Sequence, residues 1–326
     1  MFAMHYLLAA IVMVFLVCSP AHGVVHHDLA VTLDPSKHYL EAENRISLPK
    51  PVQTVTFTLY AKLALITGAT TDQAEGSGAF SGGQKTAYVP CQALDSPAAR
   101  LEAIELDASH HDGVPLRRYH ITFYTHRQHI ALCYRGKIHH PLTKSAQEYA
   151  RSFGKTPGTI GEEGVFLAHT SHWYPQFPES SNPIPGNSTS AHGFITFQLE
   201  TRLPVGWESV SQGERIYHLV TDTGNIVRWT ESAPQEEIYL IAAPFHVYHQ
   251  AAGSAQAMVY LRQPDPAMTR KYLDATAGYL EMYRQLIGPY PYAKFALVEN
   301  FWETGYGMPS FTLRTYALTD ALGYGC

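Results

Sequence analysis

The sequence predicts a mostly β first domain, in the form of an antiparallel saddle or sandwich, followed by the start of a smaller α+β domain. Runs in which apolar and polar residues alternate recur from residue 24 to about residue 249. Glycine, proline, asparagine and aspartate separate these runs, as is typical of short antiparallel strands. One clear helical pattern follows, between two strand patterns near the C-terminus. We therefore divide the chain into a leader (1–23), a β-rich domain (24–253) and the incomplete start of a second domain (254–326).

The leader is predicted from an apolar run, Tyr6 to Val17, followed by small residues up to Gly23. This pattern is typical of a signal peptide, and we expect cleavage near Gly23 and a secreted or periplasmic protein. The run is shorter than the about 20 apolar residues of a membrane span, so we expect no stable span in the mature chain. An uncleaved anchor and a lipid on Cys18 are the alternatives.

Composition narrows the class of protein. The chain has 326 residues, of which 45% are hydrophobic and 16% charged, as expected for a globular protein with room for two domains. The formal net charge is −5 and no basic run occurs. Nucleic acid is therefore not an expected partner, because phosphate backbones are bound by clustered cations.

Alternating strands dominate the predicted first domain. Alternation buries one face of each strand and exposes the other, so two sheets or one saddle-shaped sheet should enclose a single core. Two glycine-rich segments, 76–83 and 154–164, are expected to be flexible connections. The clearest alternating runs are 55–60, 120–124, 194–199 and 237–241.

Cysteine usage leaves two readings open. Removal of the leader takes Cys18 away and leaves Cys91 and Cys133 in the first domain of a protein sent to an oxidising compartment. We predict a disulfide between them, and two separately buried thiols are the alternative. Cys326 is left without a predicted partner.

The second domain begins with a strand, 258–261, and a helix whose two ends are marked. Asp265 suits the N-cap, Pro266 suits the first helical position, and Gly288 followed by proline should end the helix. A second strand, 294–299, follows. An apolar and aromatic stripe on the helix is expected to face the core, and it consists of Tyr272, Thr276, Tyr279, Tyr283 and Leu286.

Candidate chemistry in the chain is sparse. A zinc hydrolase site needs a His-Glu-x-x-His helix, and no His-Glu dipeptide occurs. The pairs 26–27, 110–111 and 139–140 are adjacent histidines, which point to opposite faces of a strand. We assign His169 and His172 to structural roles, and the acidic pairs 162–163 and 236–237 to solvated surface. We therefore predict no catalytic residue and no metal ligand in this chain.

One segment near the C-terminus is suited to peptide binding. Gly305 and Gly307 flank Tyr306 and would let a peptide backbone approach closely, and Met308 follows. An extended segment of this kind can add a substrate strand to a sheet. A β-bulge followed by an edge that ends at Pro309 is the alternative.

The segments that carry a resemblance to a known family are 173–175, 194–207, 239–245, 288–292 and 298–313. Taken together, these segments make the sequence resemble the gluzincin aminopeptidase family, of the membrane alanyl aminopeptidase type. The resemblance implies an N-terminal β saddle, a thermolysin-like catalytic domain, a peptide substrate, and zinc as the cofactor of an intact family member. The family's substrate-binding strand aligns on Met308, and we predict that the substrate-binding residues are Glu303, Gly305, Tyr306, Gly307 and Met308.

Two departures from the family pattern limit what the resemblance implies. Pro309 and Ser310 stand where the family has the glutamate and asparagine of its substrate-binding strand, which leaves exopeptidase or endopeptidase character open. Glu303 is close in sequence and is a candidate substitute for that glutamate. The zinc ligands are absent, and residues 314–326 do not resemble the family's continuation.

We therefore expect the N-terminal fragment of a secreted zinc aminopeptidase-like protein, inactive by itself. A non-catalytic secreted β-sandwich module that binds proteins or glycans is the alternative. The sequence specifies neither peptide preference nor oligomeric state.

Overall fold

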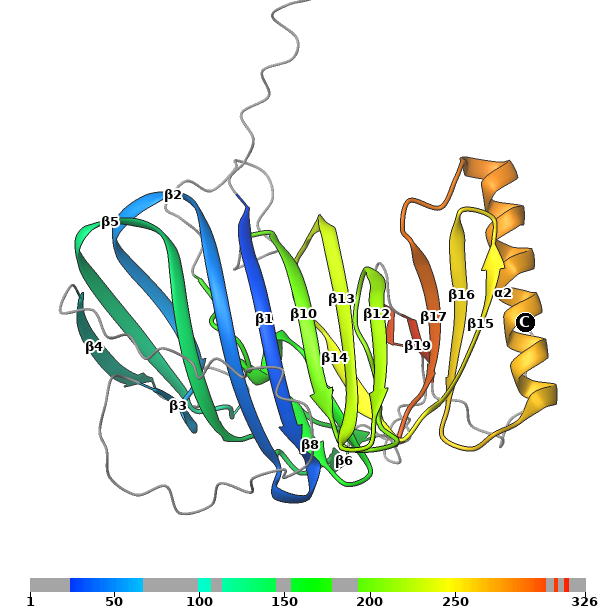
Figure 1. Cartoon of the computed structure of the whole chain (residues 1–326), viewed down its shortest axis with the longest axis horizontal. Helices are drawn as coiled ribbons and strands as arrows, with labels where there is room; N and C mark the ends of the chain where they lie inside the picture. Colours follow the sequence, from blue (N-terminus) through cyan, green and yellow to red (C-terminus); the bar gives the residue numbers. More distant parts are fainter. Residues whose placement is uncertain are drawn as a thin grey trace, which may run out of the picture.

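The computed structural model describes residues 24–66, 99–106, 113–144, 154–177, 193–302, 308–309 and 314–316. Within these residues strands form sheets of eight, five, four and two strands (Figure 1). The predicted mostly β fold class is confirmed. The leader, the 76–83 segment, Cys91 and the histidines at 110–111 lie outside the described residues.

The eight-stranded sheet forms most of the first domain. Its order is β12-β13-β10-β1-β2-β5-β3, with β4 also paired to β5. β1 and β10 run parallel, and the other pairs in this sheet are antiparallel. The strands are β1 (Val25–Asp34), β2 (Tyr39–Tyr60), β3 (Leu63–Leu65), β4 (Ala99–Leu106), β5 (Leu116–Lys137), β10 (Ile195–Leu203), β12 (Glu214–Thr221) and β13 (Gly224–Gln235).

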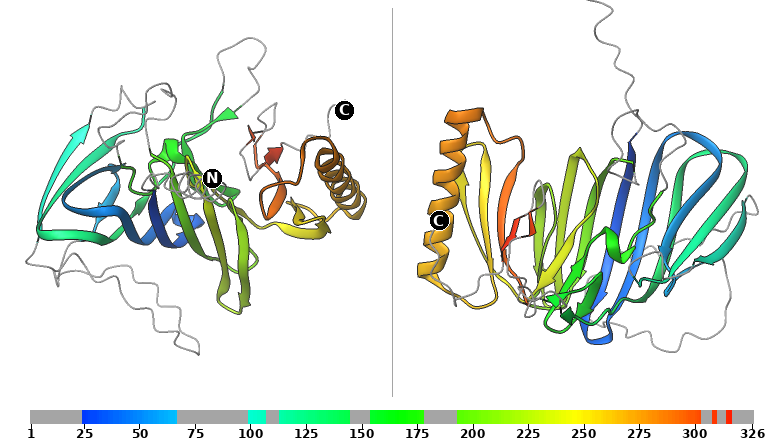
Figure 2. Two further views of the ribbon diagram at one scale, coloured as in Figure 1. Left: turned by 90° about the horizontal axis from the view of Figure 1, so that it is seen from above. Right: turned by 180° about the vertical axis from the view of Figure 1, so that it is seen from behind.

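The four-stranded sheet packs against the buried face of the large one (Figure 2). Its order is β11-β14-β9-β8, and its strands are β8 (Gly158–Gly161), β9 (Gly164–Leu167), β11 (Glu208–Val210) and β14 (Leu240–Ala243). Trp173 and Trp229 are fully buried in the core that the two sheets share. A ribbon of β6 (Thr143–Lys144) and β7 (Gly154–Lys155) and two 3-10 turns, η1 (Pro35–Lys37) and η4 (His169–Ser171), complete this part.

Two predictions about segments of this domain were wrong in detail. The glycine-rich 154–164 segment contains β7, β8 and the start of β9 instead of a flexible connection. Gly158 is needed because a Cβ there would lie 2.4 Å from the Cβ of Ser171. In the 237–241 run only the last two residues are in a strand, since β14 begins at Leu240.

The five-stranded sheet has the order β15-β16-β17-β19-β18. The helix α2 (Pro266–Ile287) connects β16 to the parallel strand β17 and covers one face of the sheet (Figure 1). The other face joins the core of the β domain through Met258, Tyr260, Ala296 and Val298. The strands are β15 (His246–Ala252), β16 (Ala255–Leu261), β17 (Lys294–Glu299), β18 (Met308–Pro309) and β19 (Arg314–Tyr316).

The predicted ends of the helix are confirmed. The Asp265 carboxylate accepts hydrogen bonds from the backbone N–H of Ala267 and Met268, Pro266 is the first helical residue, and Gly288 is the C-cap. The division at residues 253 and 254 falls in the turn between β15 and β16, and it stays a prediction. No helix in the described segments is both long enough and apolar enough to cross a membrane.

The predicted buried face of the helix was correct only in part: Thr276 is buried and Tyr272 packs against the core, but the other three residues are exposed. Tyr279 and Tyr283 are each 51% exposed and Leu286 is 69% exposed. The residues that α2 buries are Thr269, Leu273, Thr276 and Leu280. These side chains pack on the alanines of β15 and β16, whereas Tyr279, Tyr283 and Leu286 are turned toward solvent.

Candidate functional site

Of the predicted substrate-binding residues, the structure describes Met308, which lies in the last strand of the five-stranded sheet. Met308 and Pro309 form β18, which pairs with β19 and is the last strand in the sheet order. The two residues thus form an edge strand, which is expected both for a segment that adds a substrate strand and for an edge that ends at Pro309. Glu303, Gly305, Tyr306 and Gly307 lie outside the described residues, so their role in substrate binding stays a prediction.

An aromatic contact joins the chain just before this segment to the small sheet. The rings of Phe166 and Trp302 meet edge to face, with centroids 5.2 Å apart. Trp302 also packs on Phe301 at 4.5 Å. Gly164 makes room for this pair, because a Cβ there would lie 2.4 Å from the Phe301 ring. The start of β9 is therefore shaped to receive the residues that follow β17.

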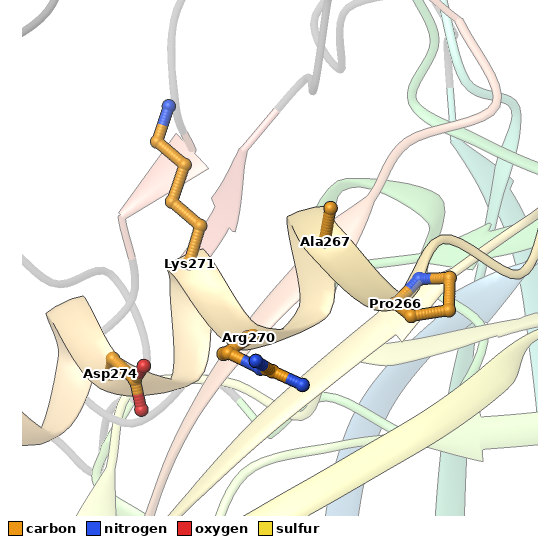
Figure 3. Close-up of a pocket in the computed structure, with 5 residues that line it drawn as sticks. All are labelled: Pro266, Ala267, Arg270, Lys271 and Asp274. Carbon is orange, nitrogen blue, oxygen red and sulfur yellow. The ribbon is translucent and has the colours of Figure 1, made fainter.

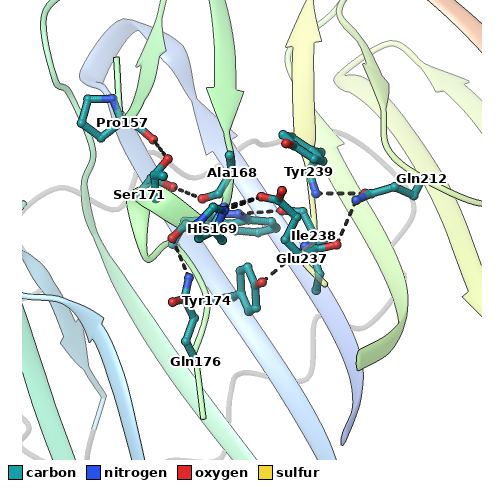
Figure 4. A network of polar contacts seen from close by, with 12 residues as sticks. Pro157, Ala168, His169, Ser171, Tyr174, Gln176, Gln212, Glu237, Ile238 and Tyr239 are labelled. Atoms are coloured by element: carbon teal, nitrogen blue, oxygen red, sulfur yellow. Dashed lines mark hydrogen bonds and ion pairs between the residues drawn. The ribbon is translucent and has the colours of Figure 1, made fainter. Parts of the chain in front are cut away.

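A polar network lies beside this contact (Figure 4). The turn η4 follows β9 and presents His169, whose Nδ1 lies 2.7 Å from Glu237 Oε2. The backbone N–H of His169 donates to the same oxygen at 3.0 Å. Gln176 donates to the His169 carbonyl at 2.6 Å. Phe166 lies three residues before His169 and also contacts the ring of Tyr239, so the aromatic contact and the network share one wall.

The backbone around Glu237 is fixed by hydrogen bonds, in addition to those of its side chain. Gln212 donates to the Glu237 carbonyl at 2.9 Å and accepts from the N–H of Tyr239. The hydroxyl of Tyr174 accepts from the N–H of Ile238 at 3.3 Å. These bonds fix the irregular link between β13 and β14, where no sheet partner satisfies the backbone groups.

The network favours an ionised carboxylate. Burial by itself raises the pKa of Glu237, but the hydrogen bonds from the His169 side chain and backbone outweigh it and lower that pKa. An ionised carboxylate only accepts hydrogen bonds, so Nδ1 of His169 must carry the proton. The arrangement orients the imidazole as acid–histidine pairs do elsewhere.

Sequence reasoning missed this pair. We had assigned Glu237 to solvated surface, yet its side chain is only 19% exposed and is hydrogen-bonded. That prediction was wrong, whereas Glu162 and Glu163 are exposed as expected. The two partners are 68 residues apart, and no local pattern in either segment links them.

The described residues do not fit a zinc ion. Nowhere in the described ranges do three or more histidine, cysteine, aspartate or glutamate side chains lie close enough to share a metal. His26 bonds to Thr196 while His27 is buried against Asn44, which confirms that these adjacent histidines face opposite ways. We therefore assign these residues no catalytic step through zinc.

Cys133 lies on β5, is buried, and forms a disulfide. Its partner lies outside the described residues. The pairing with Cys91 stays a prediction.

A shallow pocket lies at the start of α2 (Figure 3). All the residues that line it come from the first turns of the helix: Pro266, Ala267, Arg270, Lys271 and Asp274. Arg270 and Lys271 project in different directions, so they do not converge on one ligand (Figure 3). We do not include this pocket in the candidate site.

The fold is similar to that of solved structures of M1 zinc metallopeptidases. No family model and no curated protein matches the sequence. Solved structures do match. The M1 zinc metallopeptidase from Deinococcus radiodurans is 13% identical, with 91% of this chain and 60% of that chain covered and a TM-score of 0.54.

Two further structures give the same result. A mutant of the D. radiodurans M1 zinc metallopeptidase with a bound Tyr-Ser-Ala substrate is 13% identical over 92% of this chain and 62% of that chain, with a TM-score of 0.55. A two-domain M1 zinc metallopeptidase mutant bound to L-tryptophan is 12% identical over the same shares, with a TM-score of 0.52. The chain thus spans about 60% of the length of the solved structures it matches. At 12–13% sequence identity, this similarity is evidence for the fold and not for the activity.

Proposed function

We propose that this chain is the N-terminal part of a secreted zinc aminopeptidase-like metallopeptidase. The observation that carries the proposal is the fold match over 92% of the chain to an enzyme solved with a bound tripeptide. In this proposal the sheets of the first domain correspond to the family's N-terminal β saddle. The unit β16–α2–β17 begins the catalytic domain.

The proposed peptide site is the segment that leads into β18. An extended peptide would pair with the free edge of the five-stranded sheet through main-chain hydrogen bonds. We propose that Glu303, Gly305, Tyr306, Gly307 and Met308 contact it. Pro309 has no backbone N–H, so it can only accept a hydrogen bond there. A peptide in this register would be held mainly by the residues before Pro309.

We propose that the 326-residue polypeptide binds peptides without cleaving them. The sequence contains no His-Glu dipeptide, and the described residues bring no ligand set together. In an intact family member zinc would activate the water that attacks the peptide bond. Its ligands would have to come from a further segment.

Activity and binding can be tested separately. The purified chain is mixed with Zn²⁺ and an amino-acid p-nitroanilide, and we expect no release of nitroaniline. Calorimetry with the peptide Tyr-Ser-Ala should show binding that Tyr306→Ala weakens, whereas Tyr283→Ala on the exposed face of α2 should leave it unchanged. Zinc-dependent release of nitroaniline would overturn the proposed inactivity.

If the unmodified chain does not bind the peptide Tyr-Ser-Ala, the proposed site is overturned. The alternative of a secreted module that binds proteins or glycans would then be examined with a glycan array. Export is tested by expression of the full sequence in a bacterial host. We propose that the exported product begins at Val24, and a product that keeps residues 1–23 would contradict this.

A further inference from the structure

Strands β16 and β17 form a layer between α2 and the β domain. Along β17 the side chains alternate, so that Leu297 packs toward the helix while Ala296 and Val298 join the core of the β domain. Lys294 is two residues before Ala296 and faces the same way. A lysine thus occupies a position on β17 where the other residues that face the β domain, Ala296 and Val298, are apolar. It is 2% exposed.

Lys294 contacts the strand across the interface. Its Nζ lies over the ring of Trp229 on β13, 4.9 Å from the centroid. Glu231 is two residues further along β13, on the same face of the strand, and is 6% exposed. The carboxylate of Glu231 accepts from the N–H of Ala233 at 2.8 Å. The contact therefore links β17 to the large sheet through a buried amine.

Among the described residues, few charges lie near this amine. Of the described ionisable groups, Glu231 is the one whose charge acts on Lys294. On the adjacent strand β16, the residue paired with Lys294 is the neutral Gln256. Further along the interface Tyr260 lies near Glu208 and Arg215, and Glu208 pairs with His218 at 2.8 Å. Among the described residues, Glu231 is therefore the carboxylate that offsets part of the loss of hydration of Lys294.

Burial disfavours the charged form of the amine. It lowers the pKa of Lys294 from 10.5 to about 7, and the charge of Glu231 opposes the shift only in part. If the layer separates from the β domain, the amine regains water and its ordinary pKa. Proton binding is therefore coupled to opening of the interface.

We propose that Lys294 makes the packing of the β16–β17 layer on the β domain depend on pH. The interface is most stable when the amine is neutral. Because the packed form has the lower pKa, packing strengthens as pH rises from about 7 toward 10.5. Below about 7 the amine is protonated in both forms and its contribution no longer changes. Within the window the opening constant should fall by up to about tenfold per pH unit.

Hydrogen exchange tests this proposal in the full chain between pH 7.5 and 9.5. Exposed carboxylates and unperturbed histidines do not titrate there. After division by the intrinsic exchange rates, exchange at 256–260 and 295–298 should slow as pH rises, while exchange at 29–33 in β1 should not. Lys294→Met keeps the length of the side chain without the charge and should remove the slope. Lys271→Met on the exposed side of α2 should keep it.

The proposal is overturned if the unmodified chain shows no slope, or if Lys294→Met keeps it. A second measurement does not depend on a variant that folds. In the unmodified chain, NMR of the lysine side-chain carbons should show that the Lys294 amine titrates well below the exposed lysines. Titration together with the exposed lysines would also overturn the proposal.

Discussion

The imidazole of His169 lies 2.7 Å from the carboxylate of Glu237, although 68 residues separate the two in sequence. The bond ties the turn after β9 to the link between β13 and β14. Both segments border the aromatic contact between Phe166 and Trp302. The pair therefore stabilises the wall against which the proposed peptide segment begins.

We predict that Glu237→Gln destabilises the chain at neutral pH by about 1–3 kcal/mol, because a partly buried charged acceptor of two hydrogen bonds is lost. The pKa of Glu237 is lowered in the folded state, so its stabilising effect is present above the ordinary value of 4.5 and is lost as pH falls below it. Urea unfolding at pH 7 and pH 3.5 measures this. The difference between the variant and the unmodified chain should shrink at the lower pH.

Glu163→Gln is the matched control for this prediction. Glu163 is exposed in the turn between β8 and β9 and should change stability little at either pH. An equal loss in the two variants would show that the bond between His169 and Glu237 adds nothing specific.

Gly164→Ala should displace the residues that follow β17. The added Cβ would lie 2.4 Å from the Phe301 ring, which must move away and disturb its contact with Trp302. We expect a loss of about 1–3 kcal/mol, as for other overpacked sites, and a red shift in tryptophan fluorescence. Gly193→Ala is the control because nothing lies within 4 Å of its Cβ position. Equal effects in both variants would contradict this account.

Gly278→Ala should stabilise the chain. Gly278 lies inside α2 and nothing lies within 4 Å of the added Cβ. Alanine loses less backbone entropy than glycine in a helix, and the gain should be about 0.5–1 kcal/mol. Thermal unfolding measures it. Gly288→Ala should instead destabilise the chain, because Gly288 has a φ of +113°.

Peptide mapping without reductant should recover Cys133 linked to Cys91. The structure shows that Cys133 is in a disulfide, and the sequence predicts the partner. Reductant should lower the stability of the chain, by about 2–4 kcal/mol for a loop of this kind. A peptide that links Cys133 to a different cysteine would show that the predicted pairing is wrong.

The helix could be predicted closely because its signals are local. Asp265, Pro266 and Gly288 fix its ends through backbone groups within one turn, and the structure places the ends at these residues. The strand 294–299 was likewise predicted with its observed bounds. The buried face of the helix was predicted only in part, since it depends on how closely β15 and β16 approach.

The candidate site could be predicted only in part. An edge strand at Met308 follows from local sequence and is present as β18. The pairing of His169 with Glu237 depends on the order of strands in two sheets, which no short pattern encodes. The lysine at position 294 was predicted to lie in a strand, but its burial against Trp229 follows from the packing of two sheets.

The parallel pairing of β1 with β10 joins residues 170 positions apart, such as His26 and Thr196. During synthesis on the ribosome, one edge of β1 must stay open until about residue 203 has emerged, even if the hairpin with β2 has formed. Non-local pairing of this kind slows folding. It also leaves the backbone N–H and C=O groups at one edge of β1 unpaired in the nascent chain, where they can pair with another chain. The growing polypeptide therefore has a long interval in which a chaperone could bind it before the eight-stranded sheet is complete.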